Sequence, residues 1–167
     1  MNLTSTLGAA LLAVSLQSPA DPLLGTFTLD PSRSDDPGKP IEQIVQSVNR
    51  FARSRARGRL SEAMAPAAEL QIEMDGGAYV LTVGDRSPLR IVPGGEAVQT
   101  TTANGDRASV RATVDGDSLL LAVEAVRGGR TQVFTPIEGG LRVETTYDVE
   151  VVAEPVTLRA FYRRTVG

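Results

Sequence analysis

The stretch LRVETTYDVEV, residues 141–151, places mainly apolar and polar side chains in strict alternation. The first set is Leu141, Val143, Thr145, Tyr147 and Val149, and the second is Arg142, Glu144, Thr146, Asp148 and Glu150. Successive side chains of a strand point to opposite faces of a sheet, so this period of two predicts a strand with one buried face and one wet face.

The same period recurs along most of the chain, with turn residues between the segments. Strands are expected at about 23–30, 68–75, 78–84, 88–92, 97–103, 107–114, 118–126, 130–137, 141–151 and 156–164. Asp115-Gly116 is a strong signal for a tight hairpin, and other glycine pairs punctuate the remaining segments. We therefore expect a mainly β protein, an antiparallel up-and-down meander of about ten strands that closes into a barrel. An open sandwich is the alternative, but sandwiches need longer crossing connections.

One segment between the first and second strands departs from this period. After the polar loop of residues 31–40, apolar residues recur every three or four positions, which predicts one α-helix at about 41–57. The apolar stripe holds Ile41, Ile44, Val45, Val48, Phe51 and Ala52. We expect this stripe to face the barrel and the helix to cover one mouth.

Five arginines crowd residues 50–59. Arg50, Arg53 and Arg57 fall opposite the apolar stripe, where they face water or a partner, so they are the candidate contact surface. The other two fall on the stripe, so the helix is expected to break near Gly58 or these side chains to reach its edge. A partner of an exported protein would be anionic lipid or polymer.

Composition excludes several classes of function. The chain has 167 residues and a net charge of −3, without the basic excess of a nucleic-acid-binding protein. It has neither cysteine nor histidine, which excludes Ser-His-Asp and Cys-His catalysis, thiolate or imidazole zinc sites and disulfides. These absences favour a non-catalytic protein without a cofactor.

The first twenty residues carry no charged side chain and include an apolar stretch of about ten residues. Ser18-Pro19-Ala20 then supplies small residues before Asp21. This pattern is typical of a cleaved signal peptide and is too short for a membrane-spanning helix. We expect residues 1–20 to be removed and residues 21–167 to form a single periplasmic or secreted domain with no transmembrane segment.

Aspartates cluster in the first loop, where Asp35-Asp36 follows Asp30. Such carboxylates can hold a hard cation, but loop aspartates more often start turns or cap helices. We therefore expect no metal site.

Gly25-Thr26-Phe27 resembles the Gly-x-Trp motif of lipocalins and related calycins, with Phe in place of Trp. In that family an arginine of the last strand lies across the aromatic ring. The resemblance implies that Arg159, Arg163 or Arg164 packs on Phe27 at the closed end of the barrel, and we name Arg159 for this role. Almost all of residues 21–167 is also similar to uncharacterised exported bacterial proteins with a lipocalin-like barrel, a likeness that implies a cavity but no activity.

These observations favour a monomeric, exported, non-catalytic barrel that binds a small apolar, lipid-like molecule in its interior. Tyr79, Tyr147, Tyr162 and Met74 share strand faces with core residues, so they would line the cavity or else fill the core. The alternative is a structural or interaction module of the cell envelope that uses the arginine-rich helix face and contacts the membrane surface. An enzyme using carboxylates or tyrosine is a third hypothesis.

Overall fold

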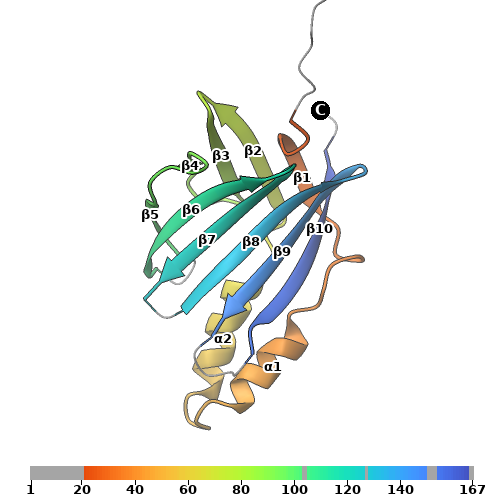
Figure 1. Cartoon of the computed structure of the whole chain (residues 1–167). Coiled ribbons are helices and arrows are strands. Elements are labelled where there is room, and N and C mark those ends of the chain that lie inside the picture. The colour runs from red at the N-terminus through yellow and green to blue at the C-terminus, as the bar shows by residue number, and fades with distance from the viewer. Residues whose placement is uncertain (1–20, 103–104, 127, 150–153, 166–167) are drawn as a thin grey trace, which may run out of the picture.

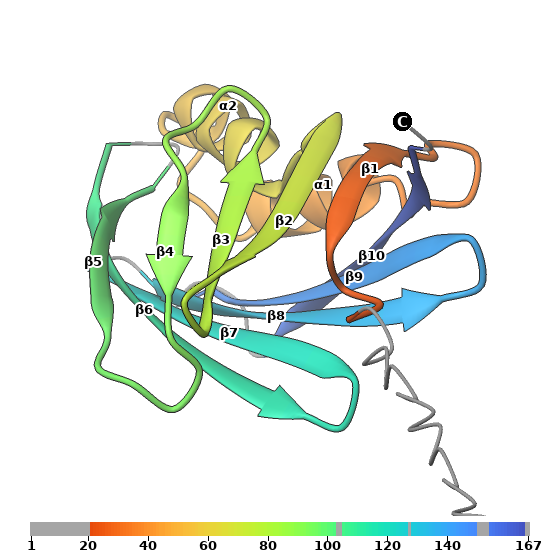
Figure 2. The same cartoon turned by 90° about the horizontal axis from the view of Figure 1, so that it is seen from above.

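The protein is described by a computed structural model that covers residues 21–102, 105–126, 128–149 and 154–165 (Figures 1 and 2). Two helices lie between the first and second strands: α1 (Gly38–Gln46) and α2 (Arg53–Met64). The ten strands are β1 (Gly25–Leu29), β2 (Glu69–Asp75), β3 (Ala78–Val83), β4 (Leu89–Ile91), β5 (Val98–Thr101), β6 (Arg107–Asp115), β7 (Ser118–Ala125), β8 (Gly128–Ile137), β9 (Gly140–Asp148) and β10 (Val156–Arg164).

All ten strands belong to one antiparallel sheet, in the order β4-β3-β2-β1-β10-β9-β8-β7-β6-β5. The first strand pairs with the last, so the sheet curls into a barrel that is closed except between β4 and β5 (Figure 2). The expected meander of about ten strands in a barrel is confirmed, and the open sandwich is not formed.

Alternation along the strands decides which side chains are buried. Leu70, Val110 and Val143 face the interior and expose 5%, 2% and 5% of their surface. On β6, Arg111 and Thr113 alternate with the buried residues and are exposed, as the period of two in the sequence requires. A second apolar cluster joins α1 and α2 to the adjoining ends of β9 and β10.

The helical segment differs from the single helix expected at 41–57. Ile41, Ile44 and Val45 are buried against the end of the barrel, as predicted, but α1 ends at Gln46. The carboxamide oxygen of Asn49 accepts a hydrogen bond from the Phe51 amide at 3.1 Å, a local turn that competes with the helix. The break therefore precedes Phe51, and Gly58 lies inside α2 rather than at a helix end.

This early break removes Phe51 from the apolar stripe to which we assigned it. Its side chain is 87% exposed, and the Arg50 guanidinium lies 5.2 Å from its ring centroid. Arg55 and Arg59 are exposed on α2 and do not return to a buried stripe. No helix in the described ranges is long and apolar enough to cross a membrane.

The two helices lie against one end of the barrel, at the bottom of Figure 1. At another point of the wall, Phe27 is fully buried and the Arg164 guanidinium lies 4.8 Å from its ring centroid. Arg164 also donates to the carbonyls of Leu24 and Pro22. A side chain at Gly25 would collide with this guanidinium, since a Cβ there would lie 2.5 Å from Arg164 Nη1.

Arg164 therefore takes the place for which we named Arg159. The Arg159 side chain instead points outward and donates to Glu144 at 2.8 Å. The register explains the difference, because Phe27 is opposite Arg164 in the β1–β10 pair, whereas Arg159 is paired with Glu144 on β9.

The loop after β1 continues the contact with β10. The Asp30 amide donates to the Phe161 carbonyl at 2.7 Å, and the Phe161 amide donates to Ser34 Oγ at 2.9 Å. The Asp35 carboxylate accepts from the Arg159 amide at 2.8 Å. Side-chain oxygens thus satisfy backbone donors that a longer β1 would have satisfied.

Replacing Phe27 by alanine should destabilise the barrel severely. The ring is fully buried, so we expect a loss of about 3–5 kcal/mol in the free energy of unfolding, measured by urea denaturation followed by circular dichroism. Phe51→Ala is the matched control, because Phe51 is 87% exposed and its loss should change stability by less than about 0.5 kcal/mol. Equal losses in the two variants would contradict this description of the core.

Candidate functional site

The barrel encloses a cavity of about 680 Å³. This volume is in the range of small-molecule binding sites, about 300–1,000 Å³. Its wall is apolar and polar in about equal parts, and the apolar part comes mainly from inward-facing strand residues, including Leu70, Leu81, Val110, Leu121, Phe134 and Val143. The interior is therefore hollow rather than filled by side chains.

The exposed members of the lining mark where the cavity meets solvent. Two of them are Asp35, in the loop after β1, and Arg159, on β10. The others come from the β3–β4 loop, residues 85–87, from Thr101 on β5 and from Ala65 after α2. These segments flank the unpaired edges of β4 and β5 and the end of α2 (Figure 2). A ligand would enter through this mouth, where no backbone ladder has to open.

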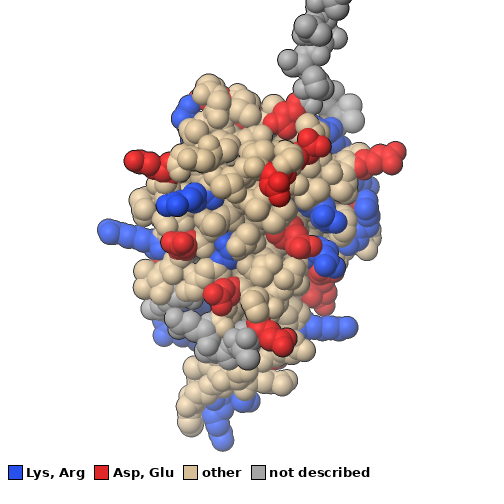
Figure 3. Space-filling model, viewed as in Figure 1, with Lys and Arg blue, Asp and Glu red and all other residues tan. Residues whose placement is uncertain are grey.

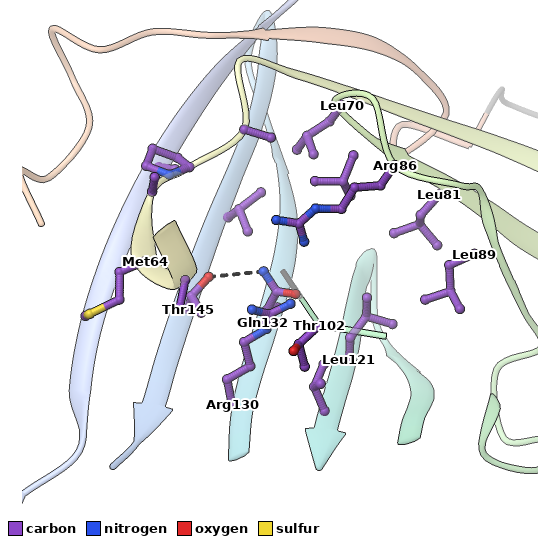
Figure 4. Close-up of a pocket in the computed structure, with 18 of the residues that line it drawn as sticks. Met64, Leu70, Leu81, Arg86, Leu89, Thr102, Leu121, Arg130, Gln132 and Thr145 are labelled. Carbon is purple, nitrogen blue, oxygen red and sulfur yellow. Dashed lines mark hydrogen bonds between the residues drawn. The ribbon is translucent and has the colours of Figure 1, made fainter. Parts of the chain in front are cut away.

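Polar side chains occupy one part of the wall. Arg130 and Gln132 project inward from β8, and Thr145 and Tyr147 project inward from β9. Gln132 Nε2 donates to Thr145 Oγ1 at 3.3 Å (Figure 4). Arg86 extends into the same cavity from the β3–β4 loop (Figure 4). The cavity thus combines apolar strand residues with a polar cluster that includes two arginines.

The ionisation of this cluster follows from its burial. Desolvation lowers the pKa of the Arg130 guanidinium, and the charge of Arg86 acts in the same direction, against an opposing effect of Tyr147. Arginine keeps its proton in proteins at neutral pH, so both groups remain cations. Desolvation also raises the pKa of Tyr147, whose hydroxyl stays protonated and can donate a hydrogen bond.

Two of the four residues predicted to line the cavity do so. Tyr147 and Tyr162 are part of the wall, and their hydroxyls donate to the backbone carbonyls of Ala63 at 3.5 Å and Ala67 at 3.1 Å. These bonds fasten the end of α2 and the following turn to β9 and β10. Desolvation by burial raises the pKa of Tyr162.

Tyr79 and Met74 do not reach the cavity. The Tyr79 side chain is buried, but its hydroxyl donates to the Asp21 carboxylate at 2.7 Å. Burial, together with this bond, raises the pKa of Tyr79 to about 12. Met74 is 43% exposed near the end of β2, where the strand has passed the edge of the core.

The three arginines of the predicted contact surface have different surroundings. Arg53 donates to the carbonyls of Gln46 and Val48, both at 3.1 Å, and so caps the end of α1. Arg57 forms a two-pronged ion pair with Glu42 at 2.6 and 2.9 Å, which ties α2 to α1. Arg50 remains exposed beside Phe51.

The aspartates of the first loop serve local structure. Asp30 accepts from the Ser32 hydroxyl at 2.6 Å, and this bond is the main cause of its lowered pKa. Asp36 accepts from the Gly38 amide at the start of α1. Among the described residues no group of three carboxylates is arranged to hold a metal ion.

Sequence reasoning missed Arg130, Gln132 and Arg86. On β8 both alternating sets mix polar and apolar residues, so the strand by itself does not reveal its inner face. The tight hairpin to β9 could have identified the inner face. Its register, Ile137↔Gly140, places Phe134 opposite Val143 and Arg130 opposite Tyr147, and residues directly opposite each other share a face of the sheet. Arg86 lies in a loop, which has no period to read.

Comparisons with known proteins describe the fold alone. No family model and no curated protein matches the sequence. Among solved structures, the chain is similar to fatty-acid-binding protein 1 of Echinococcus granulosus, with a TM-score of 0.60, 15% identity and coverage of 87% of this chain and 98% of that one. The chain is also similar to a secretory abundant heat soluble protein of Ramazzottius varieornatus, with a TM-score of 0.60, 15% identity and coverage of 88% of this chain and 98% of that one. For the fatty-acid-binding protein of Drosophila melanogaster brain, the TM-score is 0.53 and the identity is 18%, with coverage of 84% of this chain and 98% of that one. The chain therefore has the ten-stranded, nearly closed barrel of fatty-acid-binding and lipocalin-like proteins.

Proposed function

We propose that the protein is an exported, non-catalytic carrier that binds a small, lipid-like molecule inside its barrel. The observation that carries this proposal is the cavity of about 680 Å³. Its wall combines apolar and polar surface in about equal parts, so it can bury the apolar part of a ligand and fix the ligand's orientation through polar groups.

Structural neighbours support the same proposal. Two of them are named for binding fatty acids, and another similar structure is a fatty acid transporter. The barrel fold also occurs in a dinoflagellate luciferase domain, so the fold by itself does not decide the function. The cavity is the more direct argument for a carrier, because it is formed by residues of this chain and not inferred from similar proteins.

Filling the cavity should abolish binding. Leu89 lines the cavity from the short edge strand β4, whereas Val92 is 46% exposed just beyond that strand. We expect Leu89→Trp to weaken binding of the uncharged fluorophore N-phenyl-1-naphthylamine by at least about tenfold, because the indole occupies ligand volume. Val92→Trp, which introduces the same side chain outside the cavity, should bind like the wild type. Failure of the wild type to bind the probe would refute the carrier.

The chain contains no tryptophan, so the same variants carry their own reporter. The single indole of Leu89→Trp should emit at shorter wavelength than that of Val92→Trp, because it is shielded from water. Native mass spectrometry of the purified wild-type protein should also show a co-purified small molecule.

Export is part of the proposal and rests on the apolar first twenty residues and the Ser18-Pro19-Ala20 pattern. Asp21, the residue after the expected cleavage site, belongs to the fold. Its carboxylate accepts from Tyr79 at 2.7 Å and from the Leu23 amide at 2.9 Å, so the fold retains the residue that would become the new terminus.

Expression of the whole chain in a bacterial host tests export and cleavage after Ala20. N-terminal sequencing of the periplasmic protein should begin at Asp21, and Ala20→Arg should block cleavage because the site requires a small residue. Recovery of the wild-type protein from the cytosol with Met1 and the following residues intact would contradict export.

A second candidate function is contact with an anionic membrane surface through the helices. Phe51 is 87% exposed between the two helices, with exposed Arg50 beside it and Arg55 and Arg59 exposed along α2. Figure 3 shows basic side chains at this lower end of the molecule. An exposed aromatic ring among cations is typical of a surface that inserts between anionic head groups.

Neutralising two of these arginines should weaken binding to phosphatidylglycerol vesicles by about 30-fold, at about 1 kcal/mol for each arginine near an anionic surface. The variant is Arg50→Gln with Arg55→Gln, and cosedimentation measures the effect. Arg107→Gln with Arg111→Gln removes the same charge from β6 and should have a smaller effect. Equal losses in the two double variants would show attraction to net charge rather than to the helices.

A further inference from the structure

Arg130 is the least expected group in the barrel. It lies in an inward-facing row, between Val123 of β7 and Tyr147 of β9. The same row continues through Val110 on β6 and Val156 on β10. Its Nε atom is buried and has no hydrogen-bond partner among the described residues. A guanidinium in such a position is unfavourable unless an oxygen accepts its protons.

No carboxylate of the described chain neutralises this charge. The ion pairs found there join Arg57, Arg90, Arg159 and Arg163 to acidic partners and involve neither Arg130 nor Arg86. Two carboxylates border the cavity, Asp35 and Asp85. Asp35 accepts from the Arg159 amide, and Asp85 is exposed beside Arg86 without pairing with either cation. The cavity thus holds two cations that repel each other, an arrangement that an anion would stabilise.

Arg130 lies toward one end of the cavity. Tyr147, opposite Arg130, packs against the helical cluster and donates to Ala63 near the end of α2. Further along β8 and β9, toward their hairpin, the inward pair is Phe134 and Val143. Arg130 therefore lies toward the end of the cavity beside α2, and Phe134 lies toward the other end.

We propose that the ligand is an anionic amphiphile, whose oxyanion head is bound by Arg130 and Arg86 beside α2 and whose apolar chain extends toward Phe134. This inference rests on the proposed carrier function and adds the ligand class and its orientation. The planar fork of a guanidinium matches the two oxygens of a carboxylate or phosphate. Gln132 lies in the same cluster, and the second N–H of its carboxamide, beside the one donated to Thr145, supplies a further donor.

Competition against N-phenyl-1-naphthylamine separates the head group from the chain. The competitors are dodecanoate, dodecyl phosphate and the uncharged dodecanol, which share one apolar chain. In the wild type we expect at least one of the two anions to bind at least about tenfold more tightly than dodecanol. Comparison of the two anions then identifies the preferred head. Dodecanol binding as tightly as both anions would overturn the inference while leaving the carrier function intact.

Variants of the two arginines test the assignment to these residues. Arg130→Gln should weaken binding of the preferred anion by about 10- to 100-fold, the loss expected for one charge-assisted interaction, and should leave dodecanol binding unchanged. Arg86→Gln should cause a smaller loss, because Arg86 is exposed at the mouth. Arg111→Gln removes an exposed charge from the outer face of β6 and is the matched control.

Thermal unfolding without ligand gives an independent readout. Arg130→Gln should leave the melting temperature equal to or above that of the wild type, because it removes a half-buried charge that no carboxylate of the described residues neutralises. A marked fall would indicate that Arg130 is structural and would overturn the inference. Arg130→Lys keeps the charge and should retain part of the preference for the anion. If the fluorophore itself fails to bind the wild type, the carrier function is refuted.

Discussion

The pairing of β1 with β10 is the constraint on which the rest of the structure depends. Without it, the sheet would divide into a four-stranded part, β1–β4, and a six-stranded part, β5–β10, because β4 and β5 are not paired. The pair is short, but it is reinforced where Arg164 crosses Phe27 and where Ser34 and Asp35 continue the hydrogen bonding to β10. Because the first strand closes on the last, only the β4 and β5 edges stay unpaired, and this places the mouth of the cavity.

Closure also decides how the helices are used. Ile41, Ile44 and Val45 bury their side chains against the end of β9 and β10, so α1 is fixed by apolar contact. By contrast α2 buries only Met64 fully, with Ala56 and Leu60 partly buried in the same cluster. The Arg57–Glu42 ion pair ties it to α1, and the hydrogen bond from Tyr147 to Ala63 ties its end to β9. The end of α2, and not α1, borders the cavity.

The arginines of this protein serve distinct purposes despite their similar distribution in the sequence. Arg164 packs on an aromatic ring, Arg53 caps a helix and Arg159 pairs across two strands. Arg130 alone among these lies inside the barrel, in a row of otherwise apolar or aromatic side chains. A residue type that is frequent throughout a chain therefore reveals little about function until its surroundings are known.

The sequence alone determined the strands, the barrel and the amphipathic start of the helical segment, because alternation and apolar periodicity are local properties. It also determined which chemistries are absent, since the chain has no histidine or cysteine. Only the tertiary structure decided that Phe51 is exposed, that Arg164 rather than Arg159 meets Phe27, and that Arg130 points inward. Each of these depends on register or on where a helix breaks, and a shift of one residue turns every side chain of a strand to the opposite face. For the same reason the hollow interior could be expected from the pattern, but the cation within it could not.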